Sequence, residues 1–173
     1  MPKASAFYYF ILDKYEQFII LCNKYNLEVY PMTNYIIHES AVSGMPQNVK
    51  RDENGRIHFT AVLQEADVKN RNGRIYPKQV LEAGIHMPLV QENLRRHNFL
   101  GEAGHPASTE LSRQTQIDLR NVAFMVEEMW WEGNKLMGKC KTTSTACGRD
   151  MAGLIEDGCQ VAFSLRAQGS VQK

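Results

Sequence analysis

The sequence predicts an α+β fold, with a mostly antiparallel β-barrel or sheet core flanked by helices. Three observations support this fold class. The expected elements follow the order strand, helix, loop, hairpin, helix, strand. Two long strand-like segments are joined by a compact turn, which is typical of antiparallel neighbours. The regular alternation of strand and helix that a doubly wound parallel sheet needs is absent.

The chain is expected to divide into a helical N-terminal extension, residues 1–45, and a main domain, residues 46–173. Apolar side chains recur near the helical period between residues 10 and 21. Charged residues interrupt this stretch, so it is too polar to span a bilayer, and it lacks the cleavage region of a signal peptide. Turn-forming residues at 43–54, with the sequence SGMPQNVKRDEN, predict a loop between the two parts.

The helices and strands of the main domain are predicted from the spacing of apolar residues and from residues that typically form turns or begin or end helices. Asn72-Gly73 is a strong turn signal, Pro77 suits the first position of a helix, and Gly158 suits a helix C-cap. The expected elements are a strand at 56–68, helices at 77–85 and 93–97, strands at 116–131 and 135–142, a helix at 145–157 and a last strand around Ser164.

Composition excludes several classes of function. The 173 residues are 43% apolar and carry a formal net charge of +1, which is ordinary for a globular protein. This balance gives no electrostatic reason to expect a nucleic acid or an anionic membrane as partner. The cysteine spacings fit neither a zinc site nor a disulfide framework, so we expect no metal. No signal peptide is evident, so we expect reduced thiols. We also expect no cofactor. The cysteines are Cys22, Cys140, Cys147 and Cys159.

The segment GCQVAFSLRAQG presents Ser164 and Arg166 two residues apart on a strand-like stretch. A serine becomes a nucleophile only when a base accepts its proton, and histidine is the usual base near neutral pH. No GxSxG or SxxK motif is present. An ordinary strand with one polar face is therefore an alternative interpretation of this segment.

Among five histidines, His105 has the most distinctive surroundings. It lies between Gly104 and Pro106, so a permissive residue precedes it and a rigid one follows. A catalytic base needs such a fixed orientation. The other histidines occur in strand-like or helical contexts, where structural roles are common. Residue patterns alone thus give a candidate pair, His105 and Ser164, beside a purely structural alternative.

Four blocks, NRNGRIYP, LGEAGHPAS, MWWEGNKLMGK and VAFSLRAQGSV, occur in this order. Together they resemble the prohead core proteases of tailed bacteriophages, of the T4-like type. The resemblance spans about residues 55–171. It implies a serine endopeptidase with a fold like that of assemblin, the herpesvirus maturational protease. It also implies that Ser164 is the nucleophile and His105 the general base.

The third catalytic residue is less clearly marked. Relatives often carry Ser-His in the strand before the Trp-Trp-Glu-Gly block, where this chain has Ala123 and Phe124. Asp118, Glu102 or no side chain at all are the alternatives for orienting the base. A Ser-His dyad supported by backbone groups or water is favoured, and Asp118 is the best side-chain candidate because it precedes the strand expected beside the catalytic one.

The resemblance further implies that the protein degrades the internal scaffold and trims capsid proteins during prohead maturation, cutting after glutamate. Leu165 and Arg166 are candidates for the oxyanion or substrate site, with Arg166 suited to acidic side chains. The scaffolding core and the major capsid protein would be substrates. The expected location is the prohead interior in the cytoplasm of a bacterial host, and a homodimer or higher oligomer is compatible with this function.

Two alternatives remain. The chain could be a catalytically inactive scaffold or capsid-interior protein with the same fold, an interpretation that Phe124 supports. A cysteine hydrolase using Cys159 or Cys140 is the less favoured alternative, because no histidine motif accompanies either residue.

Overall fold

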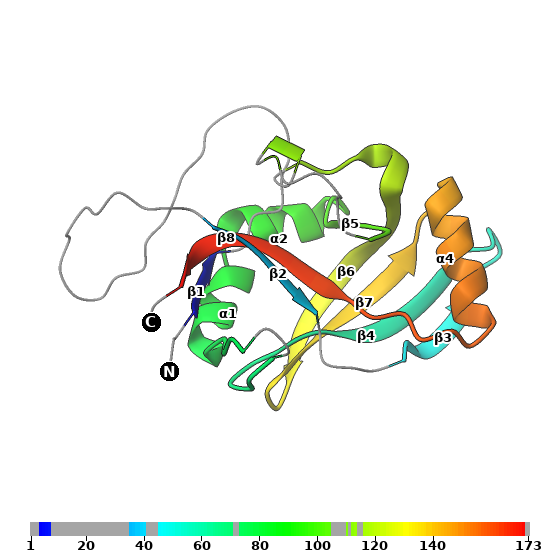
Figure 1. The fold of residues 1–173 in the computed structure, drawn as a ribbon. Helices are drawn as coiled ribbons and strands as arrows, with labels where there is room; N and C mark the ends of the chain where they lie inside the picture. The colour runs from blue at the N-terminus through cyan, green and yellow to red at the C-terminus, as the bar shows by residue number, and fades with distance from the viewer. Residues whose placement is uncertain are drawn as a thin grey trace.

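A computed structural model of the chain provides its fold (Figure 1). It describes residues 4–7, 35–40, 45–70, 73–104, 110, 112–113 and 116–171, with the strands 4–7, 35–40 and 164–171 described by their backbone. The elements are β1 (Ala4–Phe7), β2 (Tyr35–Ser40), β3 (Gln47–Arg51), β4 (Ile57–Glu65), α1 (Lys78–Ile85), α2 (Pro88–Arg95), β5 (Leu100–Glu102), the 3-10 helix η1 (Leu119–Asn121), β6 (Val122–Glu132), β7 (Lys135–Thr142), α4 (Ala146–Glu156) and β8 (Ser164–Val171).

The described strands form two antiparallel sheets. A five-stranded sheet has the order β3-β4-β7-β6-β5, and a three-stranded sheet has the order β1-β8-β2. Figure 1 shows β8 and β2 running across one side of the larger sheet, and β8 contacts β4. The predicted α+β class with antiparallel strands is confirmed. A closed barrel and a likeness to assemblin stay predictions.

The five-stranded sheet has two chemically distinct faces because neighbouring residues on a strand point to opposite sides. Phe59 of β4 pairs with Cys140 of β7, which pairs with Val126 of β6, and all three are buried. The next row, through His58 and Lys141, carries polar and charged side chains. The sheet is therefore apolar on one face and charged on the other.

Helices cover the apolar face. Thr145 caps the N-terminus of helix α4, and its hydroxyl accepts a hydrogen bond from the backbone N–H of Gly148 at 3.0 Å. From this start, the apolar positions of α4 recur at the helical period and enter the core. The core residues are Ile57, Phe59, Ala61, Leu63, Val90, Phe99, Ala123, Val126, Cys140, Met151, Ala152, Ile155 and Phe163.

The three-stranded sheet joins distant parts of the chain. Strand β2 pairs with β8 from Tyr35 opposite Gly169 to Ser40 opposite Ser164. Strand β1 pairs with the far end of β8, with Ala4 opposite Val171. Residues 35–40 therefore share a sheet with Ser164, while the expected division at residue 45 stays a prediction.

Several segments differ from their sequence-based predictions. The helix expected at 93–97 is α2, which begins at Pro88, and the strand expected at 116–131 begins at Val122 after η1. The expected loop at residues 43–54 contains β3, an exposed edge strand that pairs with β4. The strand is irregular because Asn48 has a φ of 52° and the register shifts there. Arg51 at its end forms a hydrogen-bonded ion pair with Glu156 of α4, which ties this edge to the helix. The helix expected at residues 10–21 lies outside the described residues.

Candidate active site

Ser164 is the first residue of β8 and forms the last pair of the ladder with β2, opposite Ser40. The residue before it is Phe163, whose side chain is only 6% exposed. The Phe163 ring stacks on Phe59 with ring centroids 5.6 Å apart and meets Phe124 edge-on at 5.1 Å. The backbone is therefore fixed in the core one residue before the candidate nucleophile.

His105 lies outside the described residues, but the chain leading to it is described. Strand β5 pairs with β6, and the backbone N–H of Ala103 donates to the carbonyl of Asn121 at 2.8 Å. Gly104 follows with a φ of +82°, which an L side chain rarely adopts. The segment that ends at His105 is thus anchored to the same sheet as Phe124.

Asp118, the preferred third member, caps η1. Its carboxylate accepts hydrogen bonds from the backbone N–H and the guanidinium of Arg120, at 3.1 Å each, and from Asn121 Nδ2 at 3.5 Å. The side-chain and backbone hydrogen bonds from Arg120 hold the pKa of the Asp118 carboxyl below its usual value. The carboxylate is therefore ionised and already oriented by Arg120, and its contact with His105 stays a prediction.

Glu102, the other carboxylate considered, lies three residues before His105. Its side chain is 4% exposed, and its Oε1 accepts hydrogen bonds from Arg113 Nη2 at 2.9 Å and from the backbone N–H of Asp118 at 2.7 Å. This charge-assisted contact ties the end of β5 to the segment that precedes β6. Glu102 thus holds the strand that leads to His105, a role that the sequence did not indicate.

The backbone positions of the candidate oxyanion and substrate residues are defined by the ladder between β8 and β2. Leu165 lies opposite Glu39, and Arg166 lies opposite His38. Arg166 shares a face of the strand with Ser164, since the two residues are two positions apart. Their roles at the oxyanion or substrate site stay predictions.

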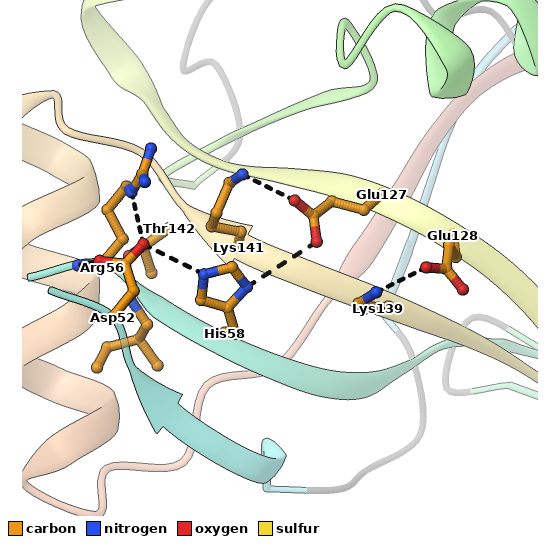
Figure 2. A network of polar contacts seen from close by, with 9 residues as sticks. Asp52, Arg56, His58, Glu127, Glu128, Lys139, Lys141 and Thr142 are labelled. Carbon is orange, nitrogen blue, oxygen red and sulfur yellow. Dashed lines mark hydrogen bonds and ion pairs between the residues drawn. The ribbon is translucent and has the colours of Figure 1, made fainter. Parts of the chain in front are cut away.

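Another histidine, His58, has carboxylates on both sides (Figure 2). Its Nε2 lies 3.3 Å from Asp52 Oδ2 and its Nδ1 lies 3.9 Å from Glu127 Oε2, while Lys141 Nζ lies 2.8 Å from Glu127 Oε1. Partial burial acts to raise the pKa of Glu127, but the hydrogen bond and charge of Lys141 outweigh it and lower that pKa. Both ring nitrogens face carboxylates rather than a hydroxyl or thiol, so the arrangement provides no nucleophile.

Cys140 is fully buried within the apolar row of the sheet, and burial raises the pKa of its thiol. A buried, protonated thiol is a poor nucleophile, which argues against the cysteine-hydrolase alternative at this residue. Within the described part of the chain, no three His, Cys, Asp or Glu side chains form a group that could hold a metal ion. In that same part, no helix is both long and apolar enough to cross a bilayer.

The described part of the chain has an α+β fold with two antiparallel sheets. Ser164 begins β8, and His105 follows β5 by three residues in the sequence. The model of the family of prohead core protein serine proteases matches residues 32–173. The chain therefore belongs to that family. The match includes both Ser164 and His105, and it begins just before β2.

Two further matches, a curated sequence and a solved structure, agree with this family. The prohead core protein protease of Enterobacteria phage T4 is 29% identical over 117 residues, which is 66% of this chain and 52% of that protein. The chain thus spans about half the length of this curated relative. The solved structure of the bacteriophage T4 capsid assembly protease, gp21, is similar with a TM-score of 0.65 and 25% identity, over 79% of this chain and 83% of that chain.

Proposed function

We propose that this protein is a serine endopeptidase that degrades the internal scaffold and trims the capsid proteins of a phage prohead. The observation that carries the proposal is the family match over residues 32–173, which includes both Ser164 and His105. The names printed for the two T4 matches, a prohead core protein protease and a capsid assembly protease, support the same activity and location. The protein would act inside the prohead, in the cytoplasm of the host bacterium.

The chemistry needs two side chains and backbone donors. Ser164 Oγ attacks the carbonyl carbon of the scissile peptide bond while His105 accepts the hydroxyl proton. The backbone N–H groups near Leu165 and Arg166 hydrogen-bond the negative oxygen of the tetrahedral intermediate. His105 then gives the proton to the departing amine, and water hydrolyses the acyl-enzyme by the reverse sequence of proton transfers. No step requires a metal or a cofactor.

Asp118 is our preferred residue for orienting His105, with Glu102 as the alternative. An orienting carboxylate fixes the tautomer of the base, so its neutral amide variant lowers kcat and changes the pH dependence of kcat/KM. We expect this outcome for Asp118→Asn and a smaller loss of kcat for Glu102→Gln. The reverse order would assign the role to Glu102, and no change in either pH profile would favour a Ser-His dyad.

Substrate choice would follow from charge. The family resemblance suggests cleavage after glutamate, and the guanidinium of Arg166 would pair with that carboxylate. Replacing the glutamate of a peptide substrate by glutamine is therefore expected to lower kcat/KM for the wild type. Arg166→Ala is expected to reduce this discrimination. Equal turnover of the two peptides by the wild type would remove this part of the proposal.

A fluorophosphonate probe tests the nucleophile directly. We expect one label per chain on Ser164, none in Ser164→Ala, and loss of peptide hydrolysis by several orders of magnitude in both Ser164→Ala and His105→Ala. Ser40→Ala is the matched control because Ser40 lies opposite Ser164 on β2 and should leave labelling intact.

A second candidate function is an inactive scaffold or capsid-interior protein with the same fold. The observation in its favour is Phe124, an apolar ring packed against Phe163 at the position where relatives often carry histidine. A folded wild-type chain that neither reacts with the probe nor cleaves prohead proteins would support this alternative. Efficient labelling of Ser164 would exclude it.

A further inference from the structure

Phe124 of β6 lies between the two described segments that precede the proposed catalytic residues. On one side its ring meets the ring of Phe163, the residue before Ser164, with centroids 5.1 Å apart and planes at 82°. On the other side its ring covers Gly101 of β5, four residues before His105. One side chain thus contacts both segments.

The contact with Gly101 is close enough to require glycine. A Cβ atom added to Gly101 would lie 2.1 Å from Phe124 Cζ and 2.2 Å from Phe124 Cε1, far inside van der Waals contact. The backbone of Gly101 does not have a positive φ, so the close approach of the ring explains the glycine. The position of the Phe124 ring therefore sets how near β5 can lie to the core.

Both neighbours of the ring depend on it for their position. Strand β5 has only three residues, pairs only with β6 in its sheet, and shifts register between Gly101 and Glu102. Phe163 precedes β8 and is held by the Phe59 ring on one side and by Phe124 on the other. A change in the Phe124 ring therefore moves the two segments relative to each other.

We propose that Phe124 is a positioning residue that sets how far β5, which leads to His105, lies from Phe163, which precedes Ser164. This inference rests on the proposed function, because it assumes that these two residues act together. Proton transfer requires the base and the hydroxyl within hydrogen-bond reach, and a misplacement of about 1 Å can cost about 100-fold in rate. Phe124 itself takes no part in the chemistry.

Three variants change the ring contact in different ways. Phe124→Leu removes the ring from both neighbours. Gly101→Ala forces β5 away from the ring while leaving the ring in place. Phe124→Tyr adds a hydroxyl at Cζ, the ring atom nearest to the Cβ position of Gly101, and presses on β5 without losing the contact with Phe163. Each is expected to lower kcat about 10- to 100-fold with KM changed by about twofold or less.

Phe59→Leu is the matched control. Phe59 stacks on the other side of Phe163 but belongs to β4, which pairs with β3 and β7 and not with β5. Phe59 is also more deeply buried than Phe124, so its variant is expected to lose at least as much stability. Phe59→Leu should nevertheless retain kcat within about threefold, because it leaves the contact with β5 intact.

The experiment measures kcat, KM, the second-order rate of fluorophosphonate labelling at Ser164 and thermal stability for the wild type and each variant. The double variant Gly101→Ala with Phe124→Leu should recover part of the rate lost by Gly101→Ala, since the smaller side chain makes room for the added methyl. An inactive and unlabelled wild type would refute the proposed function. An active wild type whose Phe124 variants lose no more rate than Phe59→Leu would refute only the positioning role.

Discussion

One face of the five-stranded sheet carries ordered charges. The other face is apolar and packs against the residue that precedes the proposed nucleophile. His58 and Phe59 are consecutive residues of β4 and point to opposite faces. On the His58 face, carboxylates and cations neutralise one another over β4, β6 and β7 (Figure 2). On the Phe59 face, apolar rings lead to the residue that precedes Ser164.

This difference shows that an ordered cluster of titratable groups does not by itself mark an active site. Both ring nitrogens of His58 face carboxylates, and neither is directed at a nucleophile. The proposed catalytic residues instead follow two short backbone segments whose positions depend on packing. If Phe124 positions these segments as proposed, the apolar face provides the precision that catalysis needs.

The largest expected effect comes from truncating a ring on the apolar face. Phe59 is 2% exposed, so Phe59→Ala is expected to lower the free energy of unfolding by about 3–5 kcal/mol. His58→Ala, one residue away on the charged face, should cost a small fraction of this. Urea denaturation of both variants measures the difference. Equal losses would contradict the assignment of the two faces.

A smaller loss is expected at Thr142, a polar residue on the apolar side of β7. Its side chain is 0% exposed, and its Oγ1 accepts a hydrogen bond from the backbone N–H of Ile57 at 2.9 Å. Thr142→Val keeps the shape but leaves that buried N–H unpaired, at a cost of about 1–3 kcal/mol. Thermal unfolding of the variant beside Thr142→Ser, which keeps the hydroxyl, separates the lost hydrogen bond from lost packing.

Replacing Asn93 of α2 is expected to raise the free energy of unfolding rather than lower it. This side chain is also 0% exposed, but within the described residues neither its Nδ2 nor its Oδ1 has a hydrogen-bond partner. Asn93→Leu removes the unpaired amide and is expected to stabilise the protein by about 1 kcal/mol. A clear destabilisation by Asn93→Leu in urea would indicate that bound water satisfies the amide.

The smallest expected effect is a change in how the free energy of unfolding depends on acid pH, and it arises at Asp52 on the charged face. The backbone N–H of Arg56 and then the hydrogen bonds of His58 and the Arg56 side chain outweigh partial desolvation and lower the pKa of Asp52 from 3.8 to about 2. The folded-state pKa is depressed, so this contribution to stability is present above about pH 4 and is lost as the pH falls toward 2.

Asp52→Asn should therefore reduce stability at pH 6 and flatten its dependence on pH between 4 and 2. Glu53→Gln, in the same turn, is the control because it leaves these hydrogen bonds intact. Stability measured by urea unfolding at several pH values provides the readout. A slope unchanged by Asp52→Asn would show that the carboxylate has no such role.

Local signals predicted much of the fold correctly. Pro77 and Gly158 bound helices found at Lys78–Ile85 and Ala146–Glu156, and the compact turn after Glu132 joins β6 to β7. Strand β3 was missed because Pro46 and Asn48 favour a turn, whereas the strand exists through its pairing with the distant β4. Pairings over long sequence separations, such as β2 with β8, leave no local pattern either.

The catalytic pair of the candidate site stays a prediction. The block around His105 stands out in the sequence because a permissive glycine precedes the histidine and a rigid proline follows it, whereas Ser164 was singled out by the family resemblance of its block. The sequence showed Phe124 only as a departure from a family pattern. Its contacts with Gly101 and Phe163 join residues from three segments of the chain, and such packing is determined only when the sheet forms.

The pairing of β1 with β8 has a consequence for the behaviour of the protein in solution. With β1 in place, β8 is an inner strand, because Gln168–Val171 face β1 and Ser164–Gly169 face β2. Removal of Ala4–Phe7 would turn that part of β8 into a sheet edge with unpaired N–H and C=O groups. Such an edge is a template for pairing with another chain. Proteolytic cleavage after Phe7 that releases β1 would therefore favour self-association through the strand that begins at Ser164.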